Sequence, residues 1–201
     1  MRSVGIMGGT FDPVHMGHLA CAEMARDACG IDEVLFIVAG NPNFKQGMQM
    51  APASERFAMV QAAIAGNDAF AASDAEVRRE GVTYTADTLL ELKDADPTAE
   101  LSFIMGTDAL LTLHAWKDAD VIARLARIIC VSRPGYALGD RERARLARAG
   151  FDVTIIEAPL LDISSSEVRQ RVAEGRSIRY LVPDAVRAHI QDRRLYRREE
   201  A

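Results

Sequence analysis

The sequence predicts an α/β fold, a Rossmann-like doubly wound parallel sheet, and three observations lead to this prediction. Five short apolar runs are nearly continuous, as is typical of parallel strands that are buried on both faces. Longer amphipathic stretches separate these runs, and such alternation predicts helices on both faces of the sheet. A glycine-bearing turn follows the first run, where sheets of this kind bind ligands. The expected strands are residues 3–7, 33–39, 101–106, 127–132 and 152–157.

The helices are expected between and after these strands. Residues 53–66 place Phe57, Val60 and Ile64 on one helical face, with Ser54 as the N-cap. The other helices are expected at residues 16–28, 85–96, 140–149 and 164–174. The length of the chain fits one domain over residues 1–201, with a helical C-terminal segment over about residues 164–201.

The composition excludes several classes of protein. The net charge of -5 argues against general binding to nucleic acid or to anionic membranes, because both require a basic surface. The sequence contains no apolar run of about 18 residues, so we expect no transmembrane helix, and its first residues resemble a strand rather than a signal peptide. The three cysteines form no C-x-x-C pair, which favours reduced thiols and a cytoplasmic protein.

The first motif is the stretch GGTFDPVHMGH, residues 8–18. Gly8 and Gly9 allow the backbone to turn sharply after the first strand and to approach a ligand closely. A helix is expected to begin near His15, and its free N–H groups favour an anion. His15 and His18 are three residues apart, so both lie on one face of this helix, where each can donate a hydrogen bond to phosphate. The motif therefore indicates a phosphate site.

Other interpretations of this motif fit less well. The glycine spacing is not that of the G-x-G-x-x-G dinucleotide fingerprint, which an NAD-dependent dehydrogenase would need. A P-loop requires a Gly-Lys pair, and the sequence contains none. A zinc protease helix requires H-E-x-x-H, whereas these histidines have a different spacing and no acid between them. The structural alternative is that both histidines cap or pack the helix.

The second motif is the stretch DISSSEVRQR. Ser164 and Glu167 have the spacing of a capping box, which predicts the start of a helix. Ser165, Ser166 and Arg169 then lie near the N-terminal end of that helix and could form a second anion site. Without the first motif, an ordinary capped helix is the better explanation of this stretch.

Both motifs resemble those of one superfamily. The stretch GTFDPVHMGH resembles the T/HxGH signature of the HIGH-type nucleotidyltransferases, and the second motif resembles their ISSTxxR signature, with Ser166 in place of the usual threonine. This resemblance implies a Rossmann-like sheet and transfer of a nucleotidyl group from a nucleoside triphosphate. It also implies that ATP or its phosphates contact Gly8, Gly9, Thr10, Phe11, Gly106, Asp108, Ser165 and Ser166.

Further segments are similar to the nicotinate mononucleotide adenylyltransferase family. They are residues 81–89, 103–118, 131–136 and 179–196, so the resemblance covers nearly the whole chain. It implies that Thr85, beside Tyr84, binds the carboxylate of the nicotinate through its backbone. Trp116, the only tryptophan, would stack on the pyridine ring, although a core position is its ordinary alternative.

The implied reaction is an in-line attack by the 5′-phosphate of nicotinate mononucleotide on the α-phosphorus of ATP. The attacking phosphate is already anionic, because its second pKa is about 6, and no general base is needed. The groups expected to stabilise the charge are His15, His18, Lys45 and Arg169. Mg²⁺ would bridge phosphate oxygens and be held mainly by phosphates and water, so we expect no metal site made of protein side chains.

One segment departs from the family pattern. The family usually has P-P-H-K in the loop after the second strand, whereas this chain has Asn43 and Phe44 before Lys45. This change leaves open a sister transferase with another acceptor, such as phosphopantetheine or nicotinamide mononucleotide, and a non-catalytic nucleotide-binding relative. The sequence also leaves open whether the chain forms a homo-oligomer.

Overall fold

The computed structural model describes residues 1–42, 50–132, 135, 137–159 and 161–197. Within these residues, six parallel strands form one sheet with the order β3-β2-β1-β4-β5-β6. The strands are β1 (Ser3–Gly9), β2 (Glu33–Val38), β3 (Phe70–Ser73), β4 (Glu100–Gly106), β5 (Ala126–Ser132) and β6 (Val153–Glu157). The strand order reverses between β1 and β4, and open α/β sheets bind their ligands at this point. The predicted fold class is confirmed.

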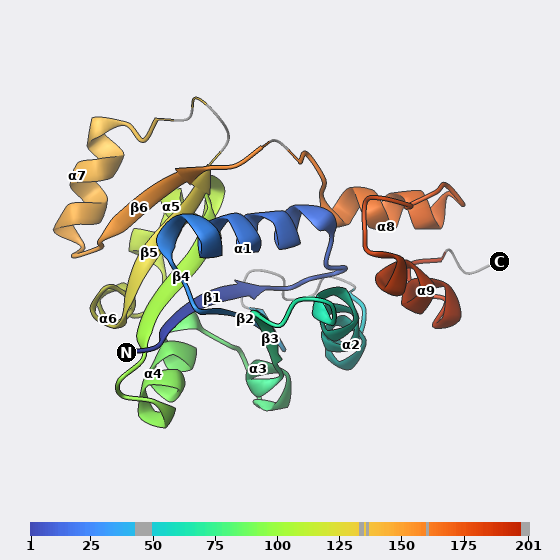
Figure 1. Ribbon diagram of the computed structural model, residues 1–201, viewed down its shortest axis with the longest axis horizontal. Helices are drawn as coiled ribbons and strands as arrows, with labels where there is room; N and C mark the ends of the chain where they lie inside the picture. Colours follow the sequence, from blue (N-terminus) through green and yellow to red (C-terminus); the bar gives the residue numbers. More distant parts are fainter. Residues whose placement is uncertain (43–49, 133–134, 136, 160, 198–201) are drawn as a thin grey trace.

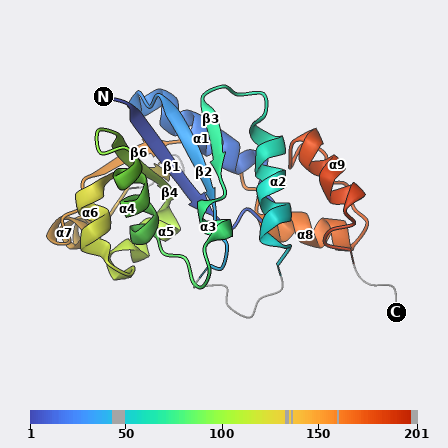
Figure 2. The same cartoon turned by 90° about the horizontal axis from the view of Figure 1, so that it is seen from below.

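Helices cover both faces of this sheet (Figures 1 and 2). They are α1 (Met16–Cys29), α2 (Ala53–Ile64), α3 (Ala75–Arg78), α4 (Thr85–Ala95), α5 (Thr107–Thr112), the 3₁₀ helix η2 (Leu113–Ala115), α6 (Ala119–Leu125), α7 (Asp140–Arg148), α8 (Ser165–Ala173) and α9 (Asp184–Asp192). The predicted capping box is present, because Ser164 Oγ accepts a hydrogen bond from the backbone N–H of Glu167 at 3.1 Å. The expected N-cap at Ser54 is wrong, because Pro52, two residues earlier, takes that position and Ser54 lies within the first turn of α2.

The alternation of side chains along each strand divides the core between the two faces. On β5, Ile129 and Val131 pack with α1, α2, α8 and α9, whereas Ile128 and Cys130 pack with the helices from α4 to α7. All four of these side chains are buried, as expected for a strand covered on both sides. The buried Cys130 thiol has a pKa raised to about 11 by its apolar surroundings, so it is a core residue rather than a nucleophile.

The first strand is longer than expected. Gly8 and Gly9 still belong to β1, where they pair with Ile37 and Val38 of β2. The prediction that the chain turns at these glycines is therefore wrong. The turn comes two residues later, at Phe11, whose φ of 49° lies in the left-handed region, and a cis Asp12–Pro13 peptide follows.

The C-terminal helices extend the molecule at one end. Figures 1 and 2 both place α9 beside α2, with α8 next to the start of α1. His189 of α9 and Glu55 of α2 join these two helices through a contact of 2.7 Å. None of the described helices is long and apolar enough to span a membrane.

Candidate active site

Two cavities open at the carboxyl ends of β1 and β4. Cavity 1, of about 470 Å³, lies among the start of α1, the end of β4 and the segment between β6 and α8. Cavity 2, of about 410 Å³, lies among the end of β1, the residues before α4 and the turn after η2. Met7 and Ile104 line cavity 1, and their chain neighbours Gly8 and Phe103 line cavity 2. Because successive residues of a strand point to opposite faces, the two cavities lie on opposite faces of one sheet edge.

The predicted histidine pair lies in cavity 1. His15 is the N-cap of α1, and its ring stacks on that of His18 with the centroids 3.6 Å apart. His18 Nδ1 accepts a hydrogen bond from the backbone N–H of His15 at 3.2 Å. The neutral ring of His18 therefore carries its proton on Nε2, which makes that atom a hydrogen-bond donor. The Phe11 and His18 rings meet edge to face, with their centroids 5.0 Å apart, and this contact orients the His18 ring.

Burial determines the charge of His15. His15 is only 6 % exposed, and its burial lowers the pKa to about 4. At neutral pH this imidazole is therefore uncharged, so it can interact with an anion as a dipole and a hydrogen-bond donor but not as a cation.

The second motif holds the first in place. Ser165 Oγ donates a hydrogen bond to the carbonyl of Pro13 at 2.8 Å. Arg169 donates to the carbonyl of Asp12 at 2.7 Å and to the hydroxyl of Ser166 at 3.3 Å. Two stretches that are about 150 residues apart in the sequence thus contact each other directly. Ser165 also lines cavity 1, so the start of α8 and the start of α1 face the same space.

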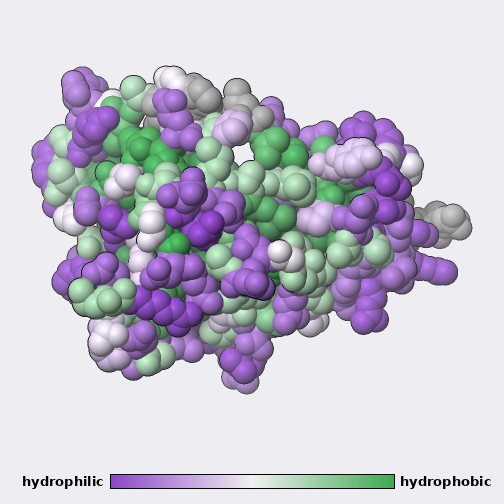
Figure 3. Space-filling view, in the orientation of Figure 1, coloured by the Kyte–Doolittle hydropathy of each residue, from purple (hydrophilic) through white to green (hydrophobic). Residues whose placement is uncertain are grey.

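Cavity 1 also includes the end of β4. Gly106 is the N-cap of α5, and Asp108 lies in its first turn. Both residues line the cavity, and the Asp108 carboxyl group is exposed there to solvent. In the space-filling view, an opening above α1 is surrounded by hydrophobic residues (Figure 3).

Cavity 2 contains the three residues expected at the pyridine ring. Tyr84 is the N-cap of α4, Thr85 is its first residue, and Trp116 follows η2. The Trp116 indole N–H donates to Thr112 Oγ1 at 3.2 Å, and its ring meets Phe103 edge to face at 6.1 Å. These contacts hold the half-buried indole between the core cluster that contains Phe103 and the wall of the cavity.

The glycine turn contributes to a different cavity from the histidines. Gly8, Gly9 and Thr10 line cavity 2, although they belong to the same motif as His15 and His18. A Cβ atom on Gly8 would lie 3.3 Å from the Phe103 ring, so a side chain at this position would crowd the sheet edge where β1 and β4 separate the two cavities. Phe11 is buried beneath the turn.

Comparison with known proteins places the chain in a family. The sequence profile of the cytidylyltransferase-like family matches residues 6–171. A protein of Roseiflexus sp., named "Probable nicotinate-nucleotide adenylyltransferase", is 48% identical over 96% of this chain and 98% of its own length. A protein of the same name from Desulfitobacterium hafniense is 42% identical over 98% of this chain and 96% of its own. The chain belongs to the nicotinate-nucleotide adenylyltransferase family.

Solved structures agree with this family assignment at the level of the fold. The nicotinic acid mononucleotide adenylyltransferase of Plasmodium falciparum, complexed with NaAD, superposes with a TM-score of 0.81. The two chains are 20% identical, and the match covers 98% of each. The same Plasmodium enzyme complexed with APC gives a TM-score of 0.78 at 18% identity, again over 98% of each chain.

This member of the family uses a buried arginine that the sequence analysis missed. Arg56 of α2 is 1 % exposed and donates to the carbonyls of Thr10 and Ala39, both at 2.7 Å. It also donates to the carbonyls of Gly40 at 3.1 Å and Ala51 at 3.0 Å. Arg56 thereby joins the segments that follow β1 and β2, both of which line cavity 2. The sequence held one signal, because Arg56 is four residues before Val60 on the apolar face of the helix.

A second missed group supports the turn of the first motif. Asp12 is 1 % exposed, and its Oδ1 accepts hydrogen bonds from the Tyr196 hydroxyl at 2.7 Å and from the Ala51 N–H at 3.2 Å. Burial and the negative charge of Asp12 raise the pKa of Tyr196 well above its usual value, so the phenol stays protonated as a donor. The C-terminal segment of this family member therefore braces the turn between β1 and α1.

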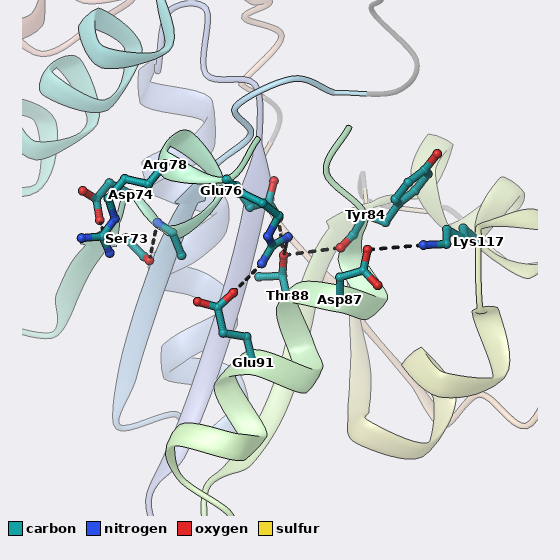
Figure 4. A network of polar contacts seen from close by, with 11 residues as sticks. Ser73, Asp74, Glu76, Arg78, Tyr84, Asp87, Thr88, Glu91 and Lys117 are labelled. Carbon is teal, nitrogen blue, oxygen red and sulfur yellow. Dashed lines mark hydrogen bonds and ion pairs between the residues drawn. The ribbon is translucent and has the colours of Figure 1, made fainter. Parts of the chain in front are cut away.

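A third network fixes the start of α4 (Figure 4). The hydroxyl of the buried Thr88 donates to Glu76 Oε1 at 2.6 Å and accepts from Arg79 at 3.1 Å. Arg79 also pairs with Glu91 one turn further along α4. Glu76 itself lines cavity 2, so this network connects the cavity wall to the helix that begins at Thr85.

Two further expectations concerned the loop around Lys45 and the binding of a metal ion. Lys45, Asn43 and Phe44 fall outside the described residues. Within the described part of the chain, no group of three or more His, Cys, Asp or Glu side chains could hold a metal ion.

Proposed function

We propose that this chain transfers the adenylyl group of ATP to the 5′-phosphate of nicotinate mononucleotide, giving deamido-NAD and pyrophosphate in NAD biosynthesis. The observation that carries the proposal is the position of the two cavities on opposite faces of one sheet edge, between β1 and β4. A donor and an acceptor nucleotide bound there would meet at the strand order reversal. The names of the relatives support the same reaction.

Cavity 1 is proposed to hold ATP. The positive ends of the α1 and α8 helix dipoles favour the triphosphate, and His15, which is uncharged, and His18 add side-chain donors beside them. Asp108 is proposed to accept a hydrogen bond from a ribose hydroxyl. Arg169 supplies a positive charge near the same end of α8, although its hydrogen bond to Asp12 also orders the turn. Lys45 is proposed as a further cation for the reacting phosphates.

The chemical step follows from these positions. The acceptor phosphate is anionic at neutral pH, so the protein has to orient two anions and stabilise the charge at the α-phosphorus rather than remove a proton. Magnesium is proposed to enter with ATP as part of the substrate. It would be held mainly by phosphates and water, and Asp162 on the wall of cavity 1 could offer a carboxylate oxygen of the kind that this ion prefers.

Cavity 2 is proposed to hold nicotinate mononucleotide. The indole of Trp116 offers a flat apolar surface for the pyridine ring. The backbone N–H of Thr85, at the start of α4, is proposed to bind the carboxylate, since no side chain caps this helix. Gly8, Gly9 and Thr10 would then border the ribose phosphate of the acceptor.

The test is an assay of pyrophosphate release with ATP, Mg²⁺ and a panel of acceptors. Nicotinate mononucleotide should give pyrophosphate and a product with the mass of deamido-NAD. Phosphopantetheine should give neither, and a higher rate with it would identify a sister transferase. Binding of ATP without pyrophosphate release from any acceptor would overturn the proposal in favour of a non-catalytic relative.

A further inference from the structure

Cavity 2 contains one positive charge that the reaction described above does not use. Lys117 is the only cationic side chain among the described residues that line this cavity. Its ammonium lies 4.2 Å from the centre of the Tyr84 ring, on the side of the cavity where Trp116 and the start of α4 meet. Figure 4 shows Lys117 extending from the turn after η2 toward Tyr84 and Asp87.

The partners of Lys117 in the free protein are weak. Asp87 Oδ2 is 3.4 Å away and Asp118 Oδ2 is 3.7 Å away, and the side chains of all three residues are between 41 and 51 % exposed. Ion pairs of this kind contribute little, because water screens them and long side chains lose freedom in forming them. The ammonium can therefore exchange a surface carboxylate for a carboxylate on a ligand at little cost.

The other charged residue of the cavity wall is already engaged. Glu76 is 8 % exposed and receives the hydroxyl hydrogen of Thr88 at 2.6 Å. Among the residues that the structure describes, a ligand in cavity 2 thus meets one cation with exchangeable partners and one anion with a buried partner. This asymmetry favours an anionic group at the end of the cavity where Lys117 and Trp116 lie.

We propose that Lys117 determines whether the acceptor is the acid or the amide of the pyridine nucleotide. This inference rests on the proposed function. The Lys117 ammonium pairs with the ring carboxylate of nicotinate mononucleotide, in addition to the backbone at Thr85. Nicotinamide mononucleotide offers no negative charge there, so it gains nothing in exchange for displacing Asp87 and Asp118.

A structural role for Lys117 makes a different prediction. The ion pair of Lys117 and Asp87 also connects α4 with the turn after η2. Its role could therefore be only to hold these two segments of the cavity 2 wall together. Loss of either partner would then have the same consequence for both acceptors. If Lys117 binds the carboxylate of the acceptor, Asp87 competes with that carboxylate for the ammonium. Removing Asp87 and removing Lys117 then have opposite effects on the preference for the acid.

The experiment compares kcat/KM for the acid and the amide acceptor. Lys117→Met should lower the acid-to-amide ratio about tenfold or more, mainly through the KM of the acid, and Lys117→Arg should restore most of it. Asp87→Asn should raise the ratio. Asp120→Asn is the matched control, because Asp120 is an exposed carboxylate that is paired with Arg124 and does not line the cavity.

A second measurement separates this inference from the proposed function. Trp116 is the only tryptophan, so its fluorescence reports binding of either mononucleotide without turnover. Weaker binding of the acid alone to Lys117→Met supports the inference even if no pyrophosphate is released, an outcome that would overturn only the proposed function. An unchanged ratio in Lys117→Met, or equal losses for both acceptors in Lys117→Met and Asp87→Asn, would overturn the role of Lys117.

Discussion

Cavities 1 and 2 share one sheet edge but are built in different ways. One wall of cavity 1 is formed by two continuous motifs, beside the ends of β4 and β5, and side chains of the second motif bind the backbone of the first, as Ser165 binds Pro13 and Arg169 binds Asp12. Cavity 2 collects short pieces from several segments, and residues outside the cavity, such as Arg56 and Thr88, hold these pieces together. The difference teaches that a local motif can specify a phosphate site, whereas the acceptor site depends on long-range contacts.

Removing Arg56 is expected to have the largest effect on this arrangement. Arg56→Met leaves four carbonyl groups without their donor, three of them in the segments that follow β1 and β2. We expect the free energy of unfolding to fall by about 3–5 kcal/mol, as measured by urea denaturation. Arg56→Lys keeps the charge and some of the donors, although in a different geometry. Its free energy of unfolding should therefore fall by less than that of Arg56→Met.

The kinetics of Arg56→Lys would show whether the two cavities are supported separately. The KM of the acceptor should rise more than the KM of ATP, because Thr10 and Ala39 line cavity 2 only. A larger rise for ATP would contradict the assignment of this arginine to the acceptor side.

Removing His18 tests the opposite cavity. His18→Ala should lower kcat about 10²–10³-fold, since it deletes an oriented donor at the reacting phosphates. The far-ultraviolet circular dichroism should stay that of the wild type, and the urea midpoint should fall only slightly, because His18 is half-buried and its loss removes one hydrogen bond at the start of α1. Turnover at nearly the wild-type rate would show that the donors of cavity 1 come from the helix N-termini alone.

The different construction of the two cavities explains what the sequence could predict. The strands, the main helices and the meeting of the two motifs follow from apolar runs, capping signals and short motifs, all of which are local. The strand β3 was missed because three of its four residues, FAAS, are small and all four are only half-buried, so they form no apolar run.

The errors at the first motif have a related cause. Gly8 and Gly9 were expected in the turn because glycine is the usual turn residue, yet the structure keeps them in β1, where pairing with β2 continues to Val38. The contacts of Arg56, and the contact of Tyr196 with Asp12, join positions 5 to 184 residues apart, and one sequence does not reveal such pairs. An arginine within an apolar helical face was the one available signal.

The titration of His15 gives a smaller effect that is specific to cavity 1. Its pKa is about 4 in the folded protein and near 6.5 when unfolded, so the unfolded state takes up the proton first as the pH falls. The stability that depends on a neutral His15 is therefore fully present above pH 6.5 and is lost as the pH falls toward 4. Between pH 7.5 and 5 the wild type should lose about 2 kcal/mol of unfolding free energy more than His15→Gln. Parallel pH profiles of the two proteins in urea titrations would contradict the burial of a neutral imidazole.

The smallest expected effect concerns the aromatic wall of cavity 2. Trp116→Ala should raise the KM of nicotinate mononucleotide up to about tenfold, because one stacked aromatic pair contributes about 0.5–1.5 kcal/mol. Trp116→Phe should keep most of the affinity, since the contact with Phe103 does not require the indole nitrogen. The KM of ATP should stay the same in both variants, because Trp116 does not line cavity 1. Equal increases for both substrates would mean that the indole supports the shared sheet edge rather than the pyridine ring, and the two cavities would then depend on one common wall.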